Sequence, residues 1–196
     1  MTKGRLEAFS DGVIAIIITI MVLELKVPHR ITLAALRPLL PVFLSYILSF
    51  IYLGIYWNNH HHLLHCARRI NGAIMWANLH LLFWLSLLPF VTGWIGENQL
   101  APLPSAVYGA VLLLSAIAYY ILQSLILAQV DRRSALAASF RRDLKGKLSP
   151  VFYAIAIGVS FVLPWLAACI YVGVALMWLI PDRRIERAVA EQGNPE

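Results

Sequence analysis

The chain has 196 residues, of which 60% are hydrophobic and only 13% are charged, and its mean hydropathy is +0.73. These values lie outside the range of soluble globular domains and predict an integral membrane protein. A net charge of +6 would suggest a nucleic-acid partner in a soluble protein, but the chain carries no nucleic-acid-binding motif and none is expected.

Five apolar stretches follow one another along the chain, and four of them have the length of a single membrane-spanning helix, about 20 residues. The last stretch, residues 150–180, would be about 46 Å long as one helix, against a hydrocarbon core of about 30 Å. Pro164 near its middle predicts a break, because proline lacks the N–H that a helix interior needs. We therefore predict an all-α integral membrane protein with six transmembrane helices, at about 8–26, 38–59, 73–95, 105–130, 146–163 and 165–181, and a cytoplasmic tail over 182–196.

Lysine and arginine concentrate on one side of this arrangement, as expected for cytoplasmic loops. Of the sixteen such residues, only Lys26, Arg30 and Arg37 fall on the other side. This asymmetry predicts that both termini are cytoplasmic. The remaining thirteen are Lys3, Arg5, Arg68, Arg69, Arg132, Arg133, Arg141, Arg142, Lys145, Lys147, Arg183, Arg184 and Arg187.

The first predicted helix has two different faces when it is placed on a wheel at 100° per residue. Thr19 lies about 60° from Ile16, whereas Asp11 lies about 140° away on the opposite side. Because nearly every position is aliphatic, the pattern by itself favours a lipid-facing or helix-packing surface. The residues within about 40° of one line are Phe9, Gly12, Ile16, Ile20 and Leu23.

Ionisable groups at membrane depth are costly and are therefore candidates for function. Ser10 or Asp11 has a simple interpretation as a helix cap. The alternative is that Asp11 faces His60 and Asn78, which the topology brings to the same depth, in a cluster that satisfies its own hydrogen bonds.

The run from Asn58 to Cys66 raises the question of a metal, because His61 and His65 have the i, i+4 spacing of helical ligands. No third ligand is evident from the sequence, so we expect no metal site. The chain also has no nucleophile, zinc-protease or phosphate-loop motif, so we expect no catalytic residues and no enzyme.

Three motifs occur together in the first 95 residues: Arg5-x-x-x-Phe9-Ser10-Asp11, then Trp57-x-x-His60-His61, and Trp76-x-Asn78 followed by Pro89-Phe90. In this order and spacing they resemble the bacterial branch of the transmembrane protein 175 family of potassium channels. Beyond residue 95 the resemblance rests on the number of spans and their hydropathy.

The resemblance implies a homotetramer in the cell membrane, in which the first helix of each six-helix subunit lines a central pore for potassium ions. No cofactor is implied. Carried over by position, hydrophobic constrictions fall on Ile16, Ile20 and Leu23, and a threonine that helps selectivity matches Thr19. A structural network that holds the first helix falls on Arg5, Phe9, Ser10, Asp11, His60, Asn78 and Trp76, with the register between His60 and His61 left open.

Two other functions remain open at this stage. A proton-coupled transporter would use Asp11 and the histidines as a relay, although such proteins place their sites at broken helices near the membrane midplane. A membrane protein with a purely structural or metal-binding role would conduct no ions.

Overall fold

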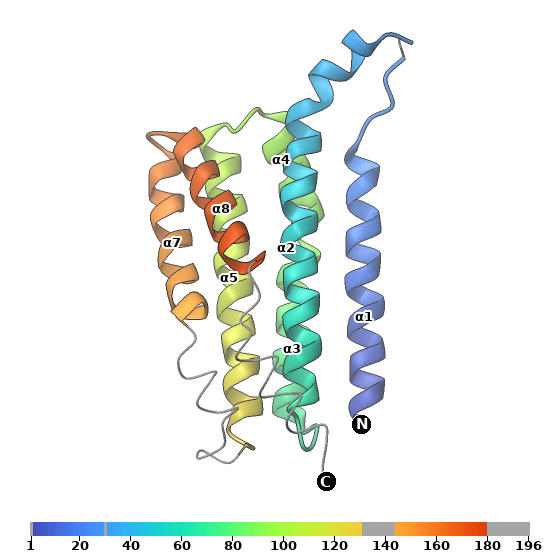
Figure 1. The fold of residues 1–196 in the computed structure, drawn as a ribbon, viewed down its shortest axis with the longest axis vertical. Helices are drawn as coiled ribbons and strands as arrows, with labels where there is room; N and C mark the ends of the chain where they lie inside the picture. Colours follow the sequence, from blue (N-terminus) through green and yellow to red (C-terminus); the bar gives the residue numbers. More distant parts are fainter. Residues whose placement is uncertain (1, 30, 131–143, 180–196) are drawn as a thin grey trace.

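The computed structural model describes residues 2–29, 31–130 and 144–179, and within these ranges all regular structure is helical. The chain passes back and forth between the two ends of an upright bundle (Figure 1). The predicted tail over 182–196 lies outside the described residues. The helices are α1 (Lys3–Ile20), η1 (Met21–Glu24), η2 (Leu33–Leu39), α2 (Leu40–His65), α3 (Gly72–Ser86), α4 (Leu88–Glu97), α5 (Pro102–Leu127), α7 (Leu144–Ser160) and α8 (Pro164–Leu179).

The first span is α-helical only as far as Ile20 and then tightens into the 3₁₀ segment η1, which ends at Glu24. In the loop that follows, Lys26 Nζ lies 2.5 Å from Glu97 Oε1 at the end of α4. This hydrogen bond, together with the charge of Glu97, raises the pKa of the Lys26 ammonium. The pair links the first span to the end of the third at this end of the bundle.

The third span differs from the single helix predicted over 73–95, because it is divided into α3 and α4 at Leu87. Pro89 has no N–H to donate to the carbonyl four residues earlier, so the helical ladder is interrupted at this point. The Leu87 N–H instead bonds the carbonyl of Trp84, three residues back, over 3.2 Å. The two helices continue in the same direction, and residues 72–97 are together long and apolar enough to cross a membrane.

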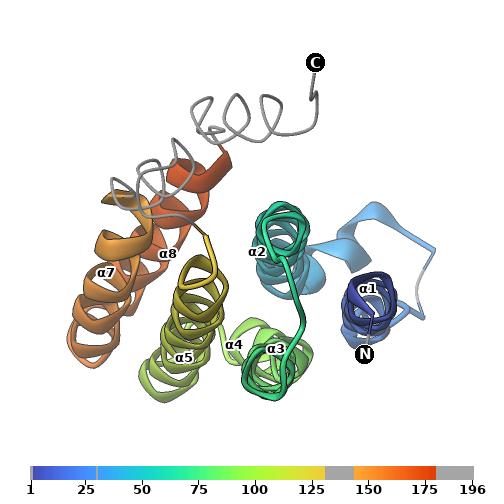
Figure 2. The same cartoon turned by 90° about the horizontal axis from the view of Figure 1, so that it is seen from below.

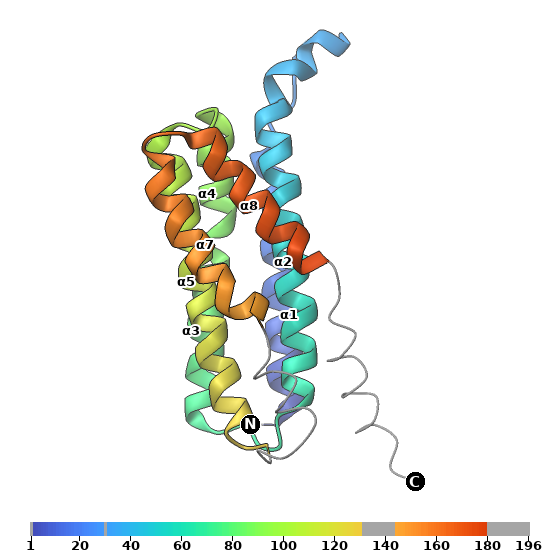
Figure 3. The ribbon, with the colours of Figure 1, turned by 60° about the vertical axis from the view of Figure 1, so that its left-hand side comes forward.

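The last apolar stretch consists of two helices, as the proline predicted. α7 ends at Ser160 and α8 begins at Pro164, where the fixed φ of proline suits the first turn of a helix. At 17 and 16 residues, α7 and α8 are each about 25 Å long, shorter than the four candidate spans before them. α8 descends obliquely from this turn toward α2 (Figure 3).

Several buried hydroxyl groups bond to a neighbouring helix, which satisfies them in an apolar environment. Tyr52 on α2 donates to the carbonyl of Tyr171 on α8 over 2.6 Å, and the Tyr171 hydroxyl donates to the carbonyl of Ser105 over 3.0 Å. Ser49 and Tyr108 share a further bond of 2.9 Å. These bonds fix the register of α2, α5 and α8.

α1 stands at the edge of the subunit, beside α2 and α3 and on the side away from α7 and α8 (Figure 2). One face of α1 therefore packs on the bundle, while the other meets no other part of the described chain. This placement determines which side chains of α1 a single subunit leaves uncovered.

Candidate functional site

The uncovered face of α1 and η1 carries the aliphatic stripe that the helical wheel identified. Ile16 is 58% exposed, Ile20 is 44% exposed and Leu23 is 76% exposed, and Gly12 on the same line is also exposed. The residues that face the bundle, by contrast, are buried: Leu6, Ser10, Ile14, Ile17 and Met21. Large apolar side chains thus lie on both faces of α1, but only one face is covered within the subunit.

The change to 3₁₀ geometry after Ile20 affects how the stripe is aligned. In a 3₁₀ helix, residues three apart lie directly above one another, whereas in an α-helix they are offset by about 60°. Leu23 lies in η1, three residues beyond Ile20. The tightening therefore brings Leu23 closer to the line of Ile16 and Ile20 than an α-helix would.

Thr19, one turn beyond Ile16, is exposed beside this stripe. Its hydroxyl donates back to the helix, to the carbonyl of Ile16 at 2.9 Å and that of Ala15 at 3.1 Å. Because the proton is held by the backbone, the oxygen lone pairs are left to accept from, or coordinate, a group outside the helix. Thr19 is thus a polar, electron-rich point on an otherwise aliphatic face.

On the covered side of α1, three buried polar side chains form a hydrogen-bonded row. His60 Nε2 lies 2.6 Å from Asn78 Oδ1, Asn78 Nδ2 donates to Ser10 Oγ over 2.9 Å, and Ser10 donates to the carbonyl of Leu6 over 2.8 Å. All three side chains are at most 1% exposed. The row links α2, α3 and α1 through polar groups that have no access to water.

Which group donates and which accepts in each of these hydrogen bonds follows from Ser10, the last residue of the row. Ser10 uses its only proton on Leu6, so it accepts from the Asn78 amide, and Asn78 must then present its oxygen to His60. His60 Nε2 is therefore the donor and carries a proton. The other ring nitrogen, Nδ1, is buried without a partner among the described residues.

Asp11 lies beside this row but is bonded elsewhere. Its Oδ1 accepts from the indole Nε1 of Trp57 over 3.0 Å, so α1 and α2 are joined at a second point. The direct Asp11–His60–Asn78 cluster that we considered does not form, because Ser10 occupies the position next to Asn78. Which histidine faces inward is also clear: His60 is buried, whereas the His61 side chain is 42% exposed.

Three residues of the expected network lie on the surface of the single chain. Arg5 is exposed, Phe9 is 48% exposed and Trp76 is 74% exposed. Phe9 and Arg5 are four residues apart on α1, and Ser10, one residue further along, points into the bundle instead. A helix turns by about 100° per residue, so neighbouring residues of this motif point in different directions and cannot all contact the same partner.

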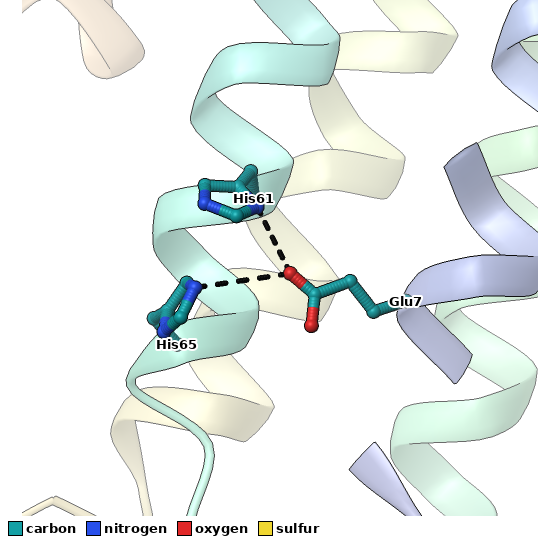
Figure 4. Close-up of side chains that lie close together, drawn as sticks. All are labelled: Glu7, His61 and His65. Carbon is teal, nitrogen blue, oxygen red and sulfur yellow. Dashed lines mark ion pairs between the residues drawn. The ribbon is translucent and has the colours of Figure 1, made fainter. Parts of the chain in front are cut away.

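Sequence reasoning missed Glu7, which belongs to the contact between α1 and α2. Its Oε1 lies 2.9 Å from Nδ1 of His61 and 3.8 Å from Nε2 of His65, so a carboxylate of α1 faces both histidines of α2 (Figure 4). A signal was available, because Glu7 precedes Asp11 by one helical turn and lies on the side of α1 opposite Ile16.

The chain is similar to known channel proteins. Residues 5–89 match the family model described as "Endosomal/lysosomal potassium channel TMEM175". A potassium channel of Chryseobacterium sp. (strain P1-3) is 56% identical over 191 residues, covering 97% of this chain and 100% of that protein. The human endosomal/lysosomal proton channel TMEM175 is 35% identical over 101 residues, which is 45% of this chain and 20% of the human protein.

The fold is also similar to a solved structure. The crystal structure of a lysosomal potassium-selective channel TMEM175 homolog from Chamaesiphon minutus matches with a TM-score of 0.79 and 29% sequence identity. The match covers 91% of this chain and 96% of that one. The likeness thus includes α7 and α8, which lie beyond the segment that the family model matches.

Proposed function

Because the chain belongs to the TMEM175 family of channels, we propose that it is a potassium-selective channel of the cell membrane, formed by four copies that surround a pore lined by α1. The comparisons support potassium as the permeant ion and a channel rather than an enzyme. The chain is a multi-pass membrane protein, and its charge asymmetry supports a topology with both termini in the cytoplasm.

The observation that carries the proposal is the uncovered aliphatic face of the helix at the subunit's edge. Ile16, Ile20 and Leu23 lie along it, and all three side chains are exposed in the single subunit. Four such helices around an axis would bring these side chains together in successive rings. Within the subunit these three side chains remain 44% to 76% exposed, as a pore built between subunits requires.

Rings of this kind act as a hydrophobic gate. A narrow aliphatic ring excludes water, and a cation that must give up its hydration shell gains nothing from methyl groups in return. Conduction therefore requires the rings to widen enough for a hydrated or partly hydrated ion. Thr19, with its oxygen lone pairs free, is the group we assign to selectivity, because a hydroxyl oxygen replaces part of the lost hydration.

The covered face of α1 supports this function without touching the ion. Ser10 with Asn78 and His60, and Asp11 with Trp57, hold α1 at a defined height and rotation against α2 and α3. Arg5, Phe9 and Trp76 are exposed in the single subunit. We assign these three to contacts that α1 and α3 make with neighbouring subunits.

The proposal is tested by reconstituting the protein in planar bilayers with potassium on one side, sodium on the other and equal pH on both. We expect a current whose reversal potential shifts toward that of potassium. Light scattering in detergent should give a protein mass of four chains of 22.0 kDa. A current that reverses at zero under these conditions would contradict potassium selectivity, and a dimer or monomer would contradict the tetrameric pore.

The alternative of a proton-coupled transporter, built on Asp11 and the histidines, predicts a different dependence. Potassium movement would stop when the pH gradient is removed, and Asp11→Asn would abolish it. A channel, in contrast, passes potassium at equal pH. The bond from Trp57 to Asp11 favours the channel, because it uses one oxygen of the carboxylate to hold two helices together.

A further inference from the structure

Glu7, His61 and His65 bring three potential ligand atoms together between α1 and α2 (Figure 4). One carboxylate oxygen and two imidazole nitrogens all lie within 4.8 Å of one another. None of the three residues belongs to the stripe of the proposed pore or to the row formed by Ser10, Asn78 and His60. The cluster therefore needs an explanation of its own.

We propose that these three side chains bind one divalent transition-metal ion of the zinc class, and that the ion fastens α1 to α2. Two histidines at i, i+4 on one helix and a carboxylate from another segment form a common three-ligand set for zinc, with a fourth position open for water. Two imidazoles disfavour magnesium and calcium, which prefer oxygen ligands throughout.

The observed distances are close to those that such an ion needs. With bonds of about 2.0–2.1 Å, two ligand atoms of a tetrahedral zinc ion lie about 3.3 Å apart. Glu7 Oε1 is now 2.9 Å from the nitrogen of His61 and 3.8 Å from that of His65, one distance slightly shorter and the other slightly longer than this value. Small rotations of side chains that are between 20% and 49% exposed would bring all three to an ion.

The site is also accessible and correctly placed to receive an ion. It lies near the N-terminal end of α1 and the C-terminal end of α2, at the bundle end to which both belong (Figure 1). Glu7 precedes Ile16 by nine residues, which places it about 180° away around the helix. A bound ion would therefore attach the back of α1 to α2 while the face of Ile16 stays unobstructed.

At this end, Lys3 already donates to the carbonyl of His65 over 2.8 Å, and Asp11 is bonded to Trp57 one turn beyond Glu7. The ion would add a third link between the same two helices. It would limit how far the end of α1 can tilt away from α2, and so it would resist any motion that separates them.

The test is a titration of ZnCl₂ into the untagged, chelator-treated full chain in detergent, followed by calorimetry and by the midpoint of thermal unfolding. We expect saturable binding of one ion per chain and a higher midpoint. His61→Ala and His65→Ala should each abolish both effects, and Glu7→Gln should weaken binding at least tenfold. His29→Ala is the control, because this exposed histidine lies at the other end of the bundle and should leave binding unchanged.

Glu7→His provides a second test, because it exchanges one zinc ligand for another and should retain the affinity that Glu7→Gln reduces at least tenfold. Zinc binding that is unchanged in the His61→Ala and His65→Ala double variant would overturn the proposal, as would no saturable binding by the parent chain. Because these measurements need no ion flux, their outcome is independent of the channel assay above.

Discussion

The amide of Asn78 on α3 donates to the hydroxyl of Ser10 on α1 over 2.9 Å, in a place that water does not reach. Because Asn78 also accepts from His60, this one side chain connects the first three spans. The bundle-facing side of α1 is thus positioned by directional bonds, whereas its other side carries the aliphatic stripe. Breaking the row should show how much these bonds contribute to the stability of the protein.

Asn78→Leu should destabilise the protein by about 1–3 kcal/mol, because it leaves the buried N–H of His60 without an acceptor. Thermal unfolding in detergent measures the loss. Asn59→Leu is a matched control, since among the described residues the Asn59 side chain bonds the carbonyl of Ile55 in its own helix. Equal losses in the two variants would show that the row between helices has no special weight.

The bond between Asp11 and Trp57 should appear as a coupling in a double-mutant cycle of Asp11→Ala and Trp57→Phe. We expect about 0.5–1.5 kcal/mol, since the carboxylate accepts from a neutral donor, Asp11 is partly buried and Trp57 is exposed. The readouts are unfolding midpoint and the fraction of tetramer on gel filtration. Strictly additive effects would mean that this bond does not hold α1 to α2.

Ile16→Asn should raise potassium flux into liposomes, because an amide in the constriction wets it and lowers the barrier to the ion. Each reduction of about 1.4 kcal/mol in the barrier corresponds to about tenfold in rate. Ile155→Asn on α7 is the control, since it places the same group on an exposed surface far from α1. If both variants, or neither, raise the flux, Ile16 is not at the constriction.

Gly96→Ala should cost about 1–3 kcal/mol of stability, because it overfills a close helix contact. A Cβ at Gly96 would lie 2.7 Å from the Cα of Val42, so α4 and α2 would have to move apart. At Gly54 on α2 an added Cβ meets nothing within 4 Å, and Gly54→Ala should stabilise its helix by up to about 1 kcal/mol. The unfolding midpoints of the two variants should therefore move in opposite directions.

Cys66, just after α2, should react slowly with iodoacetamide. Burial raises the pKa of its thiol, although the charge of Lys3 partly opposes this. Since the thiolate is the reactive form, a raised pKa lowers its fraction at neutral pH and moves the rise in rate to higher pH. The rate is measured on a Cys169→Ser background, where Lys3→Ala should slow it further. A rate at pH 7 equal to that of a free cysteine would contradict this.

The division of α1 into two faces was predictable, because a helix repeats every 3.6 residues and burial follows that period. Two other features were not predictable from the period. The 3₁₀ turn at Leu23 changes the alignment of the stripe, and the third span, predicted as one helix, is divided at Leu87 just before Pro89. Hydropathy averaged over about 20 residues does not register such a local interruption.

The partners of the polar residues were predicted only in part. The sequence placed His60 and Asn78 at one depth, but it did not show that Ser10 would stand next to Asn78, nor that Asp11 would bond Trp57. The helical period places Glu7 on the side of α1 opposite Ile16, but no spacing along the chain relates it to His61 and His65, so its contact with them was missed. Its proximity to them depends on how α1 rotates and slides against α2.

The sequence by itself determined that the chain lies in a membrane, that it crosses in helices, and which residues share a face of the first one. These properties follow from local hydropathy and the helical period, which need no knowledge of neighbours. The tertiary structure decided which face α1 turns to the bundle and which histidine is buried. It also decided that Glu7 lies beside two other histidines, His61 and His65. Those outcomes depend on the packing of helices against one another, and the spacing of residues along a chain does not specify that register.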